Sequence, residues 1–164
     1  MAQFQLGSIS TGTLRTEDLL PTFIDAITAL GGTLPNDLEC VKHMEYTNLP
    51  SYASVAVIDD AADFWVSDDA GYDMQALENT LQELCPPFVY FGSLEGDGAD
   101  FGFWPDMDAI AEALRYKSVA VEDSAPDGQS HENWIEEDSV FIHVTDHGNV
   151  TVMDMERNVL WSVV

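Results

Sequence analysis

Cys40 and His43 are the first residues whose types and spacing could support a reaction, because a neighbouring histidine can activate a cysteine thiol. A reactive thiolate also needs a nearby cation or a helix N-terminus. Here Glu39 and Glu45 flank the pair, and both carry the opposite charge to the one required. Cys40 and Cys85 fit neither a zinc site nor a disulfide framework. We therefore interpret both cysteines as buried, reduced thiols.

Acidic stretches with glycines suggest calcium binding as a second chemistry. An EF-hand loop needs oxygen ligands at its first, third and fifth positions. Counted from Asp68 or from Asp97, the third position is alanine and the fifth is aromatic, so neither stretch fits. The segment 95–100, EGDGAD, still offers carboxylate and carbonyl oxygens for a different kind of cation site. The remaining histidines show no metal-ligand spacing: His131, His143 and His147.

Catalytic and nucleotide-binding motifs are absent from the sequence. It contains no G-x-S-x-G, P-loop or G-x-G-x-x-G pattern. The glycine-rich segment 92–102 lacks a lysine and carries carboxylates that would repel a phosphate. Pairs of carboxylates are uninformative, because any separation can be found among 30 acidic residues. We therefore predict a protein that is not an enzyme and has no cofactor and no metal site.

Charge is the extreme property of this chain. It has 30 Asp and Glu against 5 Lys and Arg, a formal net charge of -25. No Lys or Arg occurs between Lys42 and Arg115, a stretch that contains 15 carboxylates. Because 46% of the residues are hydrophobic, we expect a folded chain rather than a disordered one. Its length predicts a single domain over residues 1–164.

Three segments have helical spacing of apolar residues. Residues 17–30 repeat them toward one face, and we expect Thr16 to cap that helix. Pro21 is tolerated only near a first turn, which suggests a later start. Residues 72–85 form a second amphipathic segment that ends at two prolines. A third helix is expected to follow Trp104, with Pro105 at its first position.

The remaining segments predict strands. Two aromatic runs in 88–104 flank a turn, and Asp97-Gly98 is a favoured hairpin dipeptide. Residues 139–163 alternate as a three-stranded meander with a turn at 147–149. Residues 122–138 read as an irregular acidic loop. Together these segments predict an α+β fold, in which the hairpin and the meander form one antiparallel sheet of about five strands with about three helices on one face.

An acidic surface attracts basic surfaces and repels nucleic acid and anionic membranes. Carboxylates four residues apart on a helix lie about 5–6 Å apart and can imitate a row of phosphates. Aromatic side chains would then supply affinity, since charge mainly speeds encounter. We predict that a basic partner binds a set of acidic residues, with Trp134 as an anchor: Asp68, Asp69, Asp73, Glu95, Asp97, Asp100, Asp106, Asp108, Glu112, Glu136, Glu137 and Asp138.

In size, charge and composition the chain resembles the small acidic anti-defence proteins of phages and mobile elements, which act as DNA mimics. The segments CPPFVYFGSLEGDGADFGFWPD and VTDHGNVTV are also similar to proteins carried on bacterial mobile elements. This resemblance implies inhibition of a host nuclease or CRISPR complex at its nucleic-acid-binding groove. It transfers no site residue, because these families share charge rather than sequence.

Two alternatives remain open at this stage. One is acidity adapted to a high-salt cytosol, and the other is a calcium-binding protein or an enzyme without a recognisable motif. The N-terminus lacks a signal-peptide pattern, and no apolar stretch approaches 18 residues. We therefore expect the cytoplasm of a bacterial host, a basic nucleic-acid-binding complex as partner, and no direct contact with nucleic acid or membrane.

Overall fold

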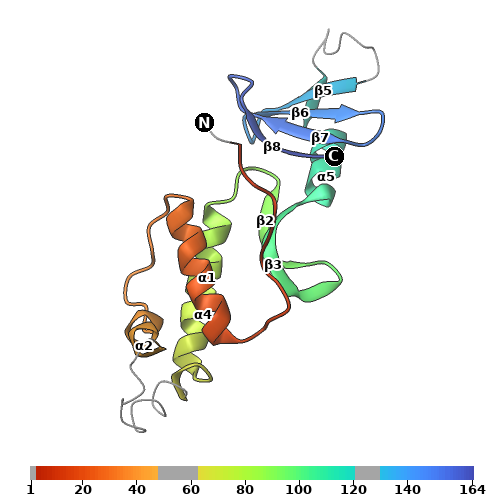
Figure 1. Cartoon of the computed structure of the whole chain (residues 1–164). Helices are drawn as coiled ribbons and strands as arrows, with labels where there is room; N and C mark the ends of the chain where they lie inside the picture. The colour runs from red at the N-terminus through yellow and green to blue at the C-terminus, as the bar shows by residue number, and fades with distance from the viewer. Residues whose placement is uncertain (1–2, 48–62, 121–129) are drawn as a thin grey trace. The chain divides into compact units, whose positions relative to one another are not determined.

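The computed structural model describes residues 3–47, 63–120 and 130–164 (Figure 1). Contacts group the chain into two compact units, which we call the sheet unit and the helix unit and describe separately. The sheet unit comprises Met1–Gly7, Cys85–Tyr90 and Phe103–Val164, and the helix unit comprises Ser8–Leu84 and Phe91–Gly102. Both units contain residues of the same hairpin. The single domain predicted over residues 1–164 stays a prediction. Since the two units share these strands, we expect them to unfold together in a single transition.

The α+β class is confirmed, but the single sheet is wrong. The hairpin belongs to a three-stranded sheet in the order β1-β3-β2, whereas the C-terminal strands form a five-stranded sheet in the order β4-β5-β6-β7-β8. The first sheet consists of β1 (Gly7–Ser10), β2 (Val89–Leu94) and β3 (Asp97–Pro105). The second consists of β4 (Ser118–Ala120), β5 (Ser130–Ile135), β6 (Val140–Thr145), β7 (Val150–Met153) and β8 (Val159–Val163).

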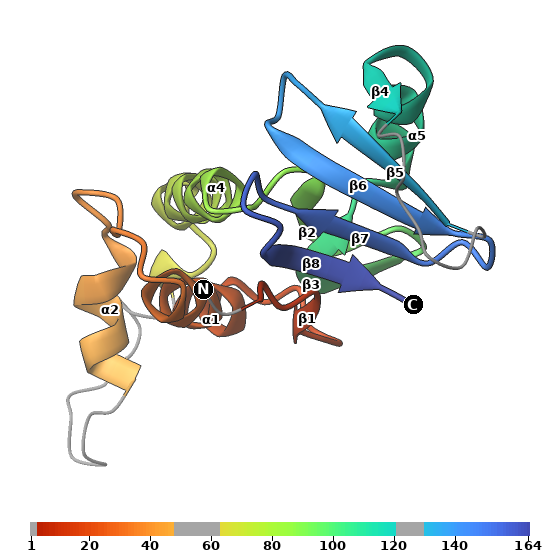
Figure 2. The same ribbon diagram turned by 90° about the horizontal axis from the view of Figure 1, so that it is seen from above.

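The meander predicted at 139–163 is confirmed as β6, β7 and β8, which lie side by side (Figure 2). Ile142 pairs with Val152, and Val152 pairs with Trp161, so these three side chains share one face and are fully buried. The helix α5 (Met107–Tyr116) packs against β4 and β5. The alternation of residues along these strands therefore places one set of apolar side chains on the buried face of the sheet.

The acidic loop expected at 122–138 is wrong for residues 130–135, which form β5; residues 122–129 lie outside the described part. β5 was missed because Glu132 and Asn133 interrupt any apolar alternation. Glu132 is buried on the sheet and forms an ion pair with Arg157, which removes the cost of a lone buried charge. Pairing with β6 along its whole length then holds the segment as a strand.

The helix unit contains α1 (Thr16–Ala29), α2 (Cys40–Thr47) and α4 (Asp68–Glu83). α1 and α4 pack along each other (Figures 1 and 2). They bury Leu20 and Ile27 from one helix and Leu77 and Leu81 from the other. Phe23 of α1 reaches the hairpin, where its ring lies edge-on to that of Phe91 at 5.0 Å. The predicted helical stripes therefore form the core of this unit.

Local details of these elements differ from the prediction. Arg15, not Thr16, is the N-cap of α1, and Pro21 lies inside the helix rather than before it. The hairpin turns at Glu95-Gly96, because Gly96 adopts a φ of 92°, so the favoured Asp97-Gly98 pair begins β3 instead. Within the described residues, no helix has the length and apolar composition needed to cross a bilayer.

Candidate functional site

The twelve acidic residues predicted to bind a partner divide equally between the two units. Six belong to the helix unit and six to the sheet unit. Nine of them have exposed side chains: Asp68, Asp69, Glu95, Asp97, Asp108, Glu112, Glu136, Glu137 and Asp138. Exposed carboxylates of the predicted set therefore occur in both units.

Asp73 was predicted to bind the partner, but this prediction is wrong because its side chain is only 6% exposed. Its Oδ2 accepts a hydrogen bond of 2.6 Å from the backbone N–H of Cys40, the first residue of α2. A carboxylate is stabilised at a helix N-terminus, where backbone N–H groups lack partners within the helix. Asp73 therefore attaches α2 to α4 and is not accessible to a partner.

Asp100, Asp106 and Trp134 are half-buried. Asp106 is the N-cap of α5 and accepts a hydrogen bond of 2.8 Å from the N–H of Ala109, so Pro105 ends β3 instead of starting this helix. Trp134 packs its ring against that of Phe141 at 4.7 Å. These contacts give Asp106 and Trp134 structural roles. Oδ1 of Asp100 is buried and forms no hydrogen bond within the described part of the chain.

The N-terminal ends of α1 and α4 lie together because the two helices run in parallel. At the other end of the pair, Gly32 lies against Leu84, the C-cap of α4. The first turns carry Glu17 and Asp18 on α1, and Asp68 and Asp69 on α4. The positive end of each helix dipole favours these carboxylates. The fold therefore gathers four acidic side chains that are about fifty residues apart in the sequence.

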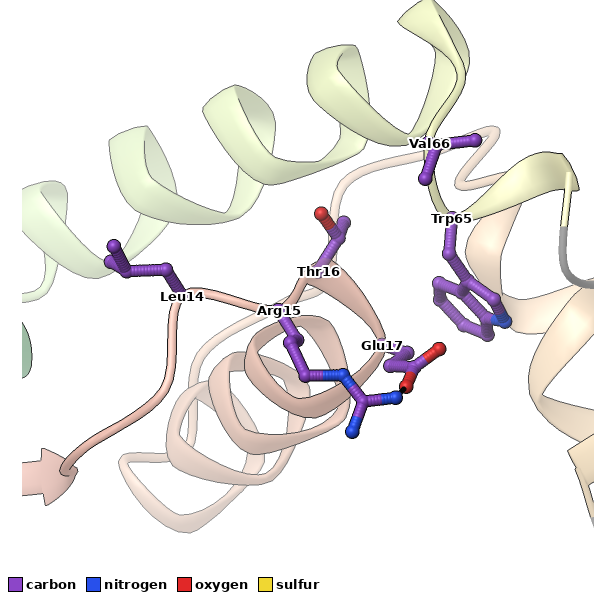
Figure 3. Close-up of a pocket in the computed structure, with 6 residues that line it drawn as sticks. All are labelled: Leu14, Arg15, Thr16, Glu17, Trp65 and Val66. Atoms are coloured by element: carbon purple, nitrogen blue, oxygen red, sulfur yellow. Dashed lines mark ion pairs between the residues drawn. The ribbon is translucent and has the colours of Figure 1, made fainter.

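A pocket of about 250 Å³ opens between these two helix ends (Figure 3). It is lined by Leu14, Arg15, Thr16, Glu17, Trp65 and Val66. Leu14 is 67% exposed and Val66 is 86% exposed, whereas Trp65 is buried and forms the floor. We call the pocket together with the four first-turn carboxylates the helix-end patch.

The floor of the helix-end patch is held by an aromatic row. The Trp65 ring meets Phe64 at 5.1 Å in an edge-on arrangement, and Phe64 stacks on the ring of His43 at 4.1 Å. His43 belongs to α2, which the Asp73–Cys40 hydrogen bond attaches to α4. Phe64, and through it His43 of α2, therefore supports the ring of Trp65.

The sheet unit has a second group of carboxylates around Lys117, which we call the acidic corner. Nζ of Lys117 lies 2.7 Å from Oε2 of Glu137, and the hydrogen bond between them lowers the pKa of Glu137. Glu137, Glu112 and Asp138 together raise the pKa of Lys117. Glu112 comes from α5 and the other two from the turn after β5, so the fold joins predicted residues that are distant in sequence.

All five cationic side chains of the protein are engaged within the chain. Four form ion pairs: Arg15 with Glu17, Lys42 with Glu39, Lys117 with Glu137, and Arg157 with Glu132. The fifth, Arg115, lies over the ring of Tyr116 at 5.1 Å. Arg15 also lies 4.0 Å from Asp18. Because the chain has 30 Asp and Glu but only 5 Lys and Arg, most of its carboxylates cannot each have a Lys or Arg of their own as a partner.

The described residues contain no group of three His, Cys, Asp or Glu side chains placed to hold a metal ion. The Cys40–His43 pair also lacks the features of a catalytic dyad. Cys40 is fully buried, and burial, reinforced by the carboxylate of Asp73, raises the pKa of its thiol to about 12. Burial likewise raises the pKa of Cys85 to about 11. Both thiols therefore stay protonated and unreactive near neutral pH.

The raised pKa of Cys40 predicts a loss of stability at alkaline pH. Above pH 9, the thiol ionises in the unfolded chain but remains protonated in the fold, so each added pH unit favours the unfolded state. We expect Cys40 to lower the free energy of unfolding by about 1.4 kcal/mol per pH unit. This loss should extend from pH 9 to about pH 12. Urea unfolding across this range would measure it.

The matched control for this prediction is Cys40→Ser, whose hydroxyl does not ionise in that range. Its unfolding free energy should fall less steeply with pH than that of the original chain, because all other titrating groups are common to both. Parallel pH profiles for the two proteins would contradict the prediction.

The chain matches no known family model, no curated protein and no solved structure. The candidate site therefore depends on the geometry alone. Sequence reasoning found Asp68 and Asp69 but missed Leu14, Trp65 and Val66. Apolar periodicity identifies residues that face a core, and it carries no signal for apolar side chains left exposed beside a distant helix end.

Proposed function

We propose that this chain is an acidic binding protein that occupies the nucleic-acid-binding surface of a basic partner, as a DNA mimic does. The observation that supports this proposal most is the distribution of charge. Every Lys and Arg is engaged within the chain, while exposed carboxylates remain at the helix-end patch and at the acidic corner. Such surfaces attract basic proteins and accelerate their encounter.

The spacing of the carboxylates supports mimicry of a phosphate row. Asp108 and Glu112 are both exposed and lie four residues apart on α5. Side chains at this spacing are neighbours about 5–6 Å apart on one helix face. The acidic corner extends this row, because Glu112, Glu137 and Asp138 all act on the same lysine, Lys117. In this proposal the protein binds without a catalytic step and does not itself bind nucleic acid.

The resemblance to anti-defence proteins extends the proposal to a target. The partner would be a host nuclease or a CRISPR complex in the bacterial cytoplasm, and blocking its groove would inhibit it. Such complexes hold nucleic acid in positively charged channels, which an acidic protein of suitable shape can enter.

Competition with duplex DNA tests the proposed function. The immobilised full chain is incubated with a bacterial lysate at low salt, and bound proteins are eluted with duplex DNA at constant ionic strength. We expect a nucleic-acid-binding complex to be released by the DNA and, in a parallel sample, by a salt ramp. Proteins that leave only with salt and not with DNA would overturn the mimicry.

The matched control neutralises exposed carboxylates without changing their size. A variant with Asp108→Asn, Glu112→Gln and Asp138→Asn removes negative charge from the sheet unit while leaving the Lys117–Glu137 pair in place. We expect this variant to release the complex at a lower salt concentration than the original chain. Equal salt concentrations for release would exclude these side chains from the interface.

Adaptation to a high-salt cytosol is the second candidate, and one observation favours it. Acidic residues occur in both units, on α1, α4, α5 and the turns of the five-stranded sheet, rather than on one element. This candidate predicts a chain that folds only in molar salt. A cooperative melting transition in dilute buffer, recorded before the competition experiment, would therefore favour the DNA mimic.

A further inference from the structure

We propose that the pocket of the helix-end patch receives one apolar side chain from a basic, extended segment of the partner. This inference rests on the proposed function, because it takes the partner to be basic, and it adds where an apolar anchor binds. The pocket provides the apolar contact, and the carboxylates around it determine the charge of the segment that carries the anchor.

The apolar contact comes from three residues. Leu14 and Val66 are 67% and 86% exposed, and Trp65, which lies on the same side of the pocket as Val66, is buried (Figure 3). Exposed apolar side chains beside a concave site commonly mark an interaction surface. A volume of about 250 Å³ suits one aliphatic side chain rather than a folded element.

The charge around the pocket selects a basic occupant. Glu17 lines the pocket and Asp18 follows it in the first turn of α1, while Asp68 and Asp69 begin α4 two residues after Val66, and exposed Asp63 precedes them in the chain. Among the described residues that line the pocket, Arg15 is the one cation, and it is already paired with Glu17. A nucleic acid or an acidic peptide would be repelled here. A basic segment gains attraction from the rim and affinity from the buried anchor.

The arrangement of the site favours preorganised binding. Trp65 is supported by Phe64 and His43, and Oγ1 of Thr13 donates a hydrogen bond of 2.7 Å to Asp18 at the edge of the patch. A binding site whose floor is already packed loses little side-chain freedom when it is filled. The partner segment, being extended, would supply its apolar side chain between flanking lysines or arginines.

A pair of synthetic heptapeptides tests this inference. One has six lysines and arginines around a central leucine, and the other has serine in place of the leucine. Binding of each dye-labelled peptide to the full chain is measured by fluorescence anisotropy at low salt. We expect the leucine peptide to bind roughly five- to tenfold more tightly, because a partly buried leucine gains apolar contact.

Variants then locate the binding site. The double variant Leu14→Ser, Val66→Ser should bind the leucine peptide only as tightly as the serine peptide. This variant should still fold, because both side chains are exposed and their loss leaves the core intact. The double variant Asp68→Asn, Asp69→Asn should lower the affinity for both peptides by the same factor. Met155→Ser, at an equally exposed apolar residue of the sheet unit, is the control and should leave the leucine preference unchanged.

The outcomes separate this inference from the proposed function. If both peptides bind equally well, or if the leucine preference survives Leu14→Ser with Val66→Ser, the pocket inference is overturned while the acidic binding function stands. If neither peptide binds at low salt, the proposed function is overturned as well. A leucine preference that depends on Leu14 and Val66 supports the inference.

Discussion

Replacing Trp161 by alanine is expected to lower the free energy of unfolding by about 3–5 kcal/mol. The Trp161 ring is fully buried in β8, opposite Val152. Its Nε1 also donates a hydrogen bond of 2.8 Å to the carbonyl oxygen of Pro87. The alanine variant therefore leaves a cavity and a carbonyl group without its donor. Urea unfolding followed by circular dichroism would measure the loss.

Two further variants make this prediction specific. Trp161→Phe keeps most of the apolar contact and loses the hydrogen bond, so its cost should be about 1–3 kcal/mol. It also remains informative if the alanine variant does not fold. Trp134→Ala is the matched control, because Trp134 is half-buried in the same sheet unit. Equal losses for Trp161→Ala and Trp134→Ala would contradict the structure.

Phe23→Ala should destabilise the helix unit by a similar amount, about 3–5 kcal/mol. Phe23 is fully buried and its ring contacts two rings of the hairpin, Phe91 at 5.0 Å and Phe101 at 5.6 Å. Edge-on aromatic pairs contribute about 0.5–1.5 kcal/mol beyond the area that they bury. The variant therefore loses both the packing of α1 and its attachment to the strands.

A double-mutant cycle separates these two losses. Phe23→Leu, Phe91→Leu and the double variant, compared by urea unfolding, should give a coupling energy of about 0.5–1.5 kcal/mol for the ring pair. Leu30→Ala, at the end of the same helix where the side chain is 38% exposed, should cost much less than Phe23→Ala. Additive single variants, with no coupling, would argue against the edge-on contact.

The position of the acidic side chains also explains how the fold tolerates so much charge. The first-turn carboxylates of α1 and α4 interact with helix dipoles, and Asp73 and Asp106 accept backbone hydrogen bonds at the ends of α2 and α5. These acids therefore stabilise local structure. Asp108 lies in the first turn of α5 and gains the same interaction. Glu112 belongs to the acidic corner, where three carboxylates surround the single amine of Lys117. This local surplus of negative charge supports the proposal that a partner neutralises it.

Several features were predictable from the sequence because they depend on neighbouring residues. Apolar spacing identified the segments of α1, α4 and α5, and alternation identified β6, β7 and β8. Composition alone determined the excess of negative charge, and the absence of motifs followed from the same residues. Helix ends and the hairpin turn were placed less well, because several capping and turn residues lie within a few positions of each other.

Only the tertiary structure decided which segments meet. Local patterns show which face of an element is apolar, but they do not show what covers that face. The hairpin therefore joined β1 rather than the meander, and the polar segment 130–135 became β5 because Arg157 compensates Glu132. Parallel packing of α1 and α4 created the helix-end patch from residues of two distant segments, and no pattern within either segment contains that arrangement.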